Sequence, residues 1–246
     1  MKKTMLSFAL ATLCLSAPAA FASEGTQWGY SGKESPENWA TLSPDFAACA
    51  GVNQSPIDLT QFIEAELAPL SFDYKPGGFE VINNGHTIQV NYEDGSVFKV
   101  DGKSFALKQF HFHAPSENLI NGKSYPFEAH LVHVSDAGEI AVVTVMYDEG
   151  EANKALASFW PQMPAKAGGK EKLASAFNAS ELMPANQDYY RFNGSLTTPP
   201  CTEGVRWFVF KEPQTIAKEQ VEAFARIMGG ENNRPVQPVN ARPVLQ

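Results

Sequence analysis

The order of hydrophobic and polar positions favours strands along most of the chain. Runs rich in Val, Ile, Phe and Tyr are separated by Asn-Gly, Asp-Gly and Pro turn signals. Strands are predicted over 79–82, 87–92, 97–100, 104–113, 127–134, 140–147, 189–192 and 205–210. Helices are predicted at 153–160 and at 215–228, the second ending at Gly229-Gly230, and 165–172 is expected to be a solvated loop.

Strands that outnumber helices and are joined mainly by short turns predict an α+β domain dominated by an antiparallel sheet. The chain has 246 residues, 43% of them hydrophobic and 17 of them Phe, which is enough for one sizeable core. No long linker or repeat divides the sequence. We therefore expect one domain over 23–246, preceded by a short leader.

One stretch, 109–133, contains four of the five histidines. On a strand, side chains two apart point to one face, so His111 and His113 can converge on one ion while two phenylalanines occupy the opposite face. If the strand carrying His130 pairs beside them, three imidazoles meet at the distances that zinc requires. Three protein ligands leave a fourth position for water, which is typical of a catalytic zinc.

The neighbouring residues strengthen this interpretation. Gln109 and Glu128 each lie two residues before a histidine, on the same strand face, where they can accept the second ring N–H. All five histidines fall between His86 and His133, which argues against scatter over a solvent face. His133 itself is predicted to be structural, because its offset along the strand aims it away from the ion that His130 would bind.

The first 22 residues have the features of a secretory signal: Lys2-Lys3, an apolar run from Met5 to Leu15, and Ala20-Phe21-Ala22 as the cleavage site. The apolar run is too short to span a bilayer, so no membrane segment is expected after cleavage. Cleavage after Ala22 would leave 17 basic against 27 acidic residues. This balance argues against nucleic acid as a partner.

Cys49 and Cys201 are the cysteines that follow the leader. In an exported protein such a pair most often forms a disulfide, which here would tie the N-terminal region to the loop bearing Thr197 and Thr198. Two unpaired buried thiols are the alternative. The leader and the disulfide together predict the periplasm of a Gram-negative bacterium.

A series of short motifs runs through the chain from residue 28 to about 243. In order, they are Trp28-Gly29-Tyr30, Asn53-Gln54-Ser55-Pro56-Ile57, Asn83-Asn84-Gly85-His86, Gln109-Phe110-His111-Phe112-His113, Glu128-Ala129-His130-Leu131-Val132-His133, Ser195-Leu196-Thr197-Thr198-Pro199-Pro200-Cys201 and Asn233-Arg234-Pro235. This order closely resembles that of the α-class carbonic anhydrases. The resemblance implies a large twisted sheet of about ten strands, with zinc at the base of a conical cleft.

The resemblance also implies a role for each residue of the site. The zinc ligands and the groups that hold their rings would be His111, His113, His130, Gln109, Glu128 and the backbone carbonyl near Asn232. Thr197 would accept a hydrogen bond from zinc-bound hydroxide and donate one to Glu117, and Thr198 would lie beside the substrate and anion position. His86 would be the proton shuttle; because it follows a hairpin-turn signal, an ordinary exposed turn residue is the alternative.

Two walls of the cleft follow from the same resemblance. The apolar wall that holds CO₂ would consist of Val132, Val142, Leu196, Val205 and Trp207. Tyr30, Asn84 and Gln89 would line the wet side that carries the proton. The chain departs from the familiar animal pattern at Ala114-Pro115, where a bulky aromatic residue commonly follows the second histidine, and this leaves the packing beneath the zinc open.

Together these features predict a zinc enzyme, a lyase, that interconverts CO₂ and bicarbonate through zinc-bound hydroxide. Sulfonamides and small anions are the expected inhibitors. One alternative is an esterase that uses the same hydroxide. Another is a non-catalytic zinc-binding module of the same fold, although family members of that kind typically lack ligand histidines. The sequence leaves the oligomeric state open.

Overall fold

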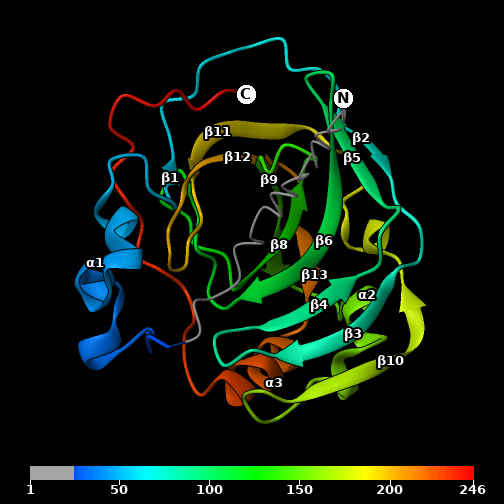
Figure 1. The fold of residues 1–246 in the computed structure, drawn as a ribbon. Helices are drawn as coiled ribbons and strands as arrows, with labels where there is room; N and C mark the ends of the chain where they lie inside the picture. Colours follow the sequence, from blue (N-terminus) through cyan, green and yellow to red (C-terminus); the bar gives the residue numbers. More distant parts are fainter. Residues whose placement is uncertain (1–24) are drawn as a thin grey trace, which may run out of the picture.

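The computed structural model describes residues 25–246 (Figure 1). The predicted signal at 1–22 lies outside these residues. Within the described part of the chain, no helix has the length and apolar character that crossing a bilayer requires.

A large twisted sheet dominates the fold (Figure 1). Its strands are β2 (Ser71–Asp73), β3 (Gly78–Asn83), β4 (Ile88–Tyr92), β5 (Val97–Val100), β6 (Lys103–His113), β8 (Phe127–Val134), β9 (Ile140–Glu149), β10 (Lys170–Phe177), β11 (Tyr189–Ser195), β12 (Glu203–Phe210) and β13 (Gln214–Ile216). The order along the sheet is β10-β3-β4-β6-β8-β9-β12-β11, with β5 also beside β6, β2 beside β5 and β13 beside β9. A separate parallel pair joins β1 (Asp58–Leu59) to β7 (Leu119–Ile120).

Most neighbouring strands are antiparallel, as the sequence predicts, and short turns join β3 to β4 and β8 to β9. The exceptions are the parallel pairings of β9 with β12 and with β13. Between β9 and β12 the chain crosses to the far edge of the sheet, forms β10 there and returns through β11. The eleven strands described are close to the number that the family resemblance implies.

The helices are short and peripheral (Figure 1). The α-helices are α1 (Trp39–Leu42), α2 (Lys154–Ala157) and α3 (Lys218–Met228), and 3₁₀ turns cover Gly32–Glu34, Pro36–Asn38, Pro44–Ala50, Trp160–Gln162 and Ala179–Leu182. Asn153 caps α2 by accepting a hydrogen bond from the Leu156 N–H at 3.1 Å. Gly229 ends α3 in the left-handed region, at φ 76°.

Several strand ends differ by one to three residues from the sequence prediction, β1, β2, β7 and α1 were not predicted, and three segments differ more. The expected loop at 165–172 runs into β10, an edge strand whose first three residues are charged and exposed and therefore lack an apolar alternation. The helix predicted at 215–228 begins only at Lys218. The β-branched pair Thr215-Ile216 belongs instead to β13, which pairs in parallel beside β9. The helix predicted at 153–160 ends as α2 at Ala157, and a 3₁₀ turn containing Pro161 follows it.

The two faces of the sheet carry separate apolar clusters. On one face, Phe110 and Phe112 of β6 are fully buried in a cluster that includes residues of α2 and Phe224 of α3. On the other face, Val142 of β9 and Trp207 of β12 belong to a second cluster. Strand alternation explains this division, because successive residues point to opposite faces. The histidines at 111, 113 and 130 share the second face.

His133 lies on the first face, away from the other histidines of its strand, as predicted. Its side chain is fully buried against Phe98, its Nδ1–H donates to the Ala141 carbonyl, and the Tyr74 hydroxyl donates to its Nε2. Burial lowers the pKa of His133 to about 3, because the charged imidazolium would lose its hydration. The residue is therefore a neutral structural element of the sheet.

This burial predicts that acid destabilises the fold through His133. The folded pKa lies below the value of about 6.5 for an exposed imidazole, so the stability from neutral His133 is present above pH 6.5 and is lost as the pH falls toward 3. Urea unfolding of the parent and of His133→Phe between pH 7 and pH 5 should show a parental stability that falls more steeply, by about 1.4 kcal/mol per pH unit. Parallel pH profiles for the two proteins would contradict this assignment.

Candidate metal centre

Three histidines meet on the second face of the sheet. His111 and His113 come from β6, and His130 of β8 lies directly opposite His111 in the antiparallel register. One ring nitrogen of each histidine lies within 4.8 Å of those of the other two. His113 and His130 are 1% exposed, whereas His111 is half-buried. The cluster therefore has one side that is more open than the rest.

Each ring is held from behind by an oxygen atom. Gln109 Oε1 lies 2.9 Å from His111 Nδ1, the Asn232 carbonyl lies 2.7 Å from His113 Nδ1, and Glu128 Oε1 lies 2.9 Å from His130 Nε2. Because these oxygens accept, the nitrogens facing them carry the ring protons. The lone pairs of His111 Nε2, His113 Nε2 and His130 Nδ1 then face one another.

These donors fit a metal ion. Burial lowers the pKa of all three histidines, and the neutral imidazole that results is the form that binds metals. Among the described residues, no group hydrogen-bonds to the buried His113 Nε2. A buried lone pair without a donor is costly unless a cation or water meets it. The group of described residues that fits a metal has three members, so the protein leaves a coordination position free.

Two buried carboxylates lie beside the histidines. Glu128 accepts hydrogen bonds from the Asn118 N–H and side-chain amide at 3.0 and 2.8 Å, and from the Glu117 N–H. Burial raises the pKa of Glu128, and the bonds from Asn118 oppose this shift. Glu117 Oε1 accepts from the Arg234 N–H at 2.9 Å, while its Oε2 lies 3.4 Å from His113 Nε2.

Burial also raises the pKa of Glu117 well above its usual range, and the charge of Glu128 adds to the effect. The hydrogen bond from the Arg234 N–H opposes this rise in the pKa of Glu117, and so does the polar hydroxyl of Thr197 beside the carboxylate. Thr197 is therefore next to Glu117, as the motif order implies. A cation at the three histidines would favour the ionised carboxylate further.

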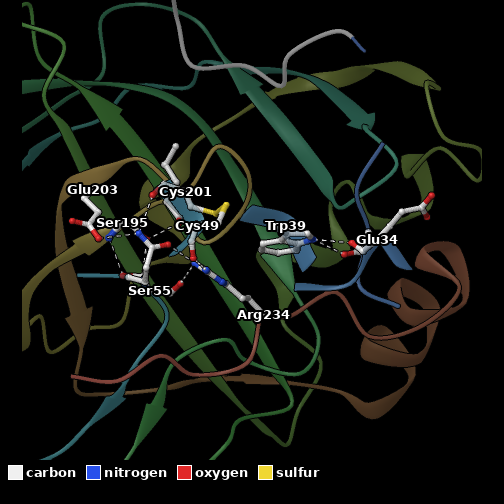
Figure 2. The surroundings of a disulfide bond; sticks show 11 residues. Glu34, Trp39, Cys49, Ser55, Ser195, Cys201, Glu203 and Arg234 are labelled. Carbon is white, nitrogen blue, oxygen red and sulfur yellow. Dashed lines mark hydrogen bonds between the residues drawn. A yellow bond between two sulfur atoms is a disulfide. The ribbon is translucent and has the colours of Figure 1, made fainter. Parts of the chain in front are cut away.

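The loop that carries Thr197 and Thr198 is fastened at both ends (Figure 2). At one end, Ser55 and Ser195 exchange two hydrogen bonds, each hydroxyl accepting from the backbone N–H of the other residue at 2.9 and 3.1 Å. At the other end, the predicted disulfide joins Cys49 to Cys201, with the Cα atoms 4.9 Å apart. The alternative of two unpaired thiols is thus wrong.

One side of the cluster is apolar. The residues expected in the CO₂ wall lie together in or against the second apolar cluster: Val132, Val142, Leu196, Val205 and Trp207. Val132 lies opposite Val142, which in turn lies opposite Trp207, so three strands build this wall. The Trp207 ring stands edge-on to the His130 ring, with centroids 4.9 Å apart.

The other side is polar and includes His86. This residue follows β3 in a turn, is half-buried, and stacks on the Trp28 ring with centroids 3.6 Å apart. Burial lowers its pKa. Tyr30 stands edge-on to Trp28, and no described group hydrogen-bonds to its buried hydroxyl. Gln89 lies opposite His111 on the neighbouring strand.

Asn84 has a different setting from the one expected. It is exposed, and its Oδ1 accepts from the backbone N–H groups of His86 and Thr87 at 2.9 and 2.8 Å. The side chain therefore closes the turn that presents His86. An Asx-turn is the ordinary conformation for such an asparagine, since its carbonyl satisfies the backbone two residues on.

Sequence reasoning missed three residues of the site. Trp28 stacks on His86, Asn118 holds Glu128, and the Arg234 guanidinium donates to Gln54 Oε1 and to two backbone carbonyls near the disulfide. Trp28 and Arg234 stand inside motifs that the sequence analysis singled out, but without a role. Only the fold brings Arg234 close to Glu117 and places Asn118, which follows Glu117 in the chain, against Glu128.

The unusual Ala114-Pro115 pair leaves the histidines in place. The Ala114 N–H donates to Asn232 Oδ1 at 2.9 Å, and the Asn232 N–H donates to the Ala114 carbonyl at 3.3 Å. The same asparagine supplies the carbonyl that holds His113. The chain after the second histidine is therefore anchored by backbone bonds and does not depend on a bulky aromatic side chain there.

Known proteins share this sequence and fold. The family model for eukaryotic-type carbonic anhydrase matches residues 34–246. A carbonic anhydrase from Neisseria gonorrhoeae is 49% identical over 243 residues, covering 98% of this chain and 96% of that protein. One from Klebsiella pneumoniae is 42% identical and covers 100% of both chains.

A solved structure agrees with these relatives. The α-carbonic anhydrase from Thermovibrio ammonificans, in complex with the inhibitor sulfanilamide, superposes with a TM-score of 0.89. It is 52% identical, and the match covers 90% of this chain and 100% of that one. With three histidines placed to bind a metal, and with this likeness over nearly its whole length, the chain belongs to the α-class, or eukaryotic-type, carbonic anhydrase family.

Proposed function

We propose that His111, His113 and His130 bind Zn²⁺ and that the site catalyses the reversible hydration of CO₂ to bicarbonate and a proton. The observation that carries this proposal is the convergence of three neutral ring nitrogens between an apolar wall and a buried carboxylate. When bound to three histidines, zinc supplies a nucleophile from water near neutral pH, a property established for carbonic anhydrases as a class.

Glu117 and Thr197 orient the reacting oxygen. An ionised Glu117 can only accept, so the Thr197 hydroxyl donates its hydrogen bond to that carboxylate. The Thr197 oxygen is then left with lone pairs alone, and it can bind only a group that carries a proton. This arrangement selects a protonated oxygen or nitrogen at the free coordination position and fixes the direction of that group's remaining lone pair.

The apolar wall holds the substrate. CO₂ has no N–H or O–H group that needs an acceptor, and the side chains of Val132 and Val142 are apolar. The Trp207 indole N–H already donates to the Ser195 carbonyl at 3.1 Å. Leu196 packs against the same cluster from the loop that also carries Thr198. We assign Thr198 to the position beside the bicarbonate anion, where its hydroxyl can donate.

His86 accepts the proton that each turnover releases. Its stacking on Trp28 and its lowered pKa favour the neutral ring, which is the form that can accept. We assign Tyr30 and Gln89 to the path between this ring and the histidine cluster, because Tyr30 stands edge-on to Trp28 and Gln89 lies opposite His111. Asn84 holds the turn. If His86 is instead an ordinary exposed turn residue, its substitution will leave the rate of proton transfer unchanged.

Two alternative functions use the same site. An esterase would employ the same nucleophile, and the relative turnover of CO₂ and an activated ester distinguishes it. A non-catalytic zinc-binding module would need no Glu117 and Thr197 beside the three histidines, yet this chain keeps both. Retention of the complete set favours the enzyme.

We place the mature protein in the periplasm. The signal-like residues 1–22 support this location, and so does the disulfide, because such bonds persist mainly in oxidising compartments. The bacterial source of the most similar relatives named above is consistent with it.

The zinc assignment predicts that His130→Ala loses both metal and activity. Loss of a group that merely holds a ligand typically costs 10- to 100-fold, so loss of a ligand should reduce CO₂ hydration by roughly 100-fold or more. Metal analysis by mass spectrometry and a stopped-flow hydration assay provide the measurements. His133→Phe, on the same strand but the other face, should keep one zinc per chain. Stoichiometric zinc in His130→Ala would sink the ligand assignment.

The shuttle assignment predicts a different phenotype for His86→Ala. Zinc content and kcat/KM should be unchanged, whereas kcat in weak buffer should fall by about tenfold or more, because general acid–base groups contribute at least that much. Added imidazole should restore the rate by carrying the proton from solution. If the variant is as fast as the parent in weak buffer, another group carries the proton.

The free coordination position predicts inhibition by sulfonamides, such as the sulfanilamide bound in the Thermovibrio ammonificans structure. Calorimetry should show one sulfanilamide per zinc, with hydration activity lost at the same stoichiometry. The zinc-free His130→Ala variant provides the control and should bind none. Equal binding to the zinc-free variant would place the inhibitor elsewhere.

A further inference from the structure

A chain of three polar side chains crosses the sheet beside the histidine cluster. Gln89 Nε2 donates to Asn91 Oδ1 at 2.7 Å, and Asn91 Nδ2 donates to Glu80 Oε2 at 2.9 Å. Glu80 belongs to β3, and the two amides belong to β4. Gln89 lies opposite His111, and Asn91 lies opposite Gln109, so the chain occupies the face that carries the metal site.

We propose that Glu80 is a positioning residue that sets the orientation of the Gln89 amide and so gives the wet wall of the cleft a hydrogen-bond acceptor. This inference rests on the proposed zinc site and on proton transfer through His86. Glu80 itself touches neither.

The charge of Glu80 sets the donor-to-acceptor direction of both hydrogen bonds in this chain of side chains. A carboxylate only accepts, so Asn91 must turn its NH₂ group toward Glu80. The carbonyl oxygen of Asn91 then faces Gln89, which must present its own NH₂ group to that oxygen. Neither amide can rotate by 180° without placing two donors or two acceptors against each other.

This direction leaves one free atom at the cleft end. No group in residues 25–246 donates a hydrogen bond to Gln89 Oε1, and that atom is not among the buried unsatisfied ones. Gln89 is 9% exposed and lies opposite His111, the most open of the three proposed ligands. Its carbonyl oxygen is therefore available to water in the cleft.

An acceptor at this position favours the outward movement of a proton. A water that donates one O–H group to Gln89 Oε1 can donate the other toward His86 and still has lone pairs to receive a proton from the metal side. If the amide were reversed, its N–H group would occupy one of those lone pairs. Glu80 thus influences the path without lying on it.

The test reverses the direction of the hydrogen bonds that join Gln89, Asn91 and Glu80, and then restores that direction. Glu80→Lys places a donor where the structure has an acceptor, so Asn91 and Gln89 should both rotate and an N–H group should face the cleft. Adding Asn91→Asp restores the original direction, because the introduced carboxylate can accept from the introduced ammonium group and from Gln89 Nε2 together. Glu93→Lys, at an exposed residue just after β4, makes the same charge change outside the chain of hydrogen bonds.

For Glu80→Lys we expect kcat in weak buffer to fall by about three- to tenfold, the range that one net hydrogen bond represents. Zinc content and kcat/KM should stay at the parental level, and imidazole should restore kcat. The Glu80→Lys/Asn91→Asp double variant and Glu93→Lys should both match the parent. If Glu80→Lys does not fold, Glu80→Gln should show a smaller loss of the same kind, because its amide can either donate or accept.

Two results would overturn the inference. One is a parental weak-buffer kcat in Glu80→Lys, or in Glu80→Gln where the lysine variant does not fold. The other is a double variant as slow as Glu80→Lys, which would indicate a general structural or charge effect. The His86→Ala variant distinguishes failure of this inference from failure of the proposed function. If His86→Ala also keeps the parental kcat in weak buffer, the proposed proton path is wrong. If His86→Ala is slow while Glu80→Lys is as fast as the parent, only the role of Glu80 is contradicted.

Discussion

The antiparallel register between β6 and β8 is the constraint on which the site depends. It places His130 opposite His111, and strand alternation places His113 on the same face. Because side chains alternate with period two, a slip of one residue in either strand would turn its histidines toward the opposite cluster. The fully buried Phe110 and Phe112 prevent such a slip, since each would have to leave the core for the cleft. The residues that build the core therefore also set the geometry of the metal site.

A polar site can exist inside this core because nearly every polar atom has a partner. Glu128 accepts from two backbone N–H groups, the Asn118 amide and His130, so its burial does not leave lone pairs unpaired. Two of the buried unpartnered atoms of the described residues lie where the proposed chemistry takes place, His113 Nε2 and Glu117 Oε2; the others are Tyr30 OH, Thr144 Oγ1, Tyr147 OH and Arg234 Nε. The two atoms at the centre of the cluster are therefore free to face a bound ion and its ligands.

The sequence predicted the parts of this molecule that follow from local pattern. The 11-residue strand β6 was predicted to within one residue, because its apolar and polar positions alternate and Phe110 and Phe112 must be buried. Its pairing with the strand of His130 followed from the chemistry of three ligands. The edge strand β10 and the short β13 were missed, because an exposed Lys-Glu-Lys run and a Gln-Thr-Ile triplet carry no periodicity that distinguishes them from loop or helix.

Contacts between distant segments could not be predicted in this way. Arg234 reaches Glu117 from 117 positions along the chain, and nothing local to either residue marks that contact. Asn118 follows Glu117 directly, but its contact with Glu128 depends on how β8 lies beside it. The stacking of Trp28 on His86 joins segments that are 58 positions apart, as the two residue numbers show. Motif order indicated that Trp28 and Arg234 belong to the family pattern, but their contacts required the fold.

The charges around the histidine cluster give a second reason, besides the type of its ligand atoms, why a divalent cation fits this site. Two buried carboxylates, Glu117 and Glu128, raise each other's cost of ionisation, and the nearest guanidinium, that of Arg234, donates only to neutral oxygens. The three imidazoles are neutral, and burial raises the pKa of both carboxyl groups, so the protein alone disfavours their ionised forms. A divalent cation at the free lone pairs offsets both carboxylates and favours the ionised forms that accept from Thr197 and His130. The ion that we propose as the source of reactivity would therefore also stabilise the hydrogen bonds that orient its own ligands.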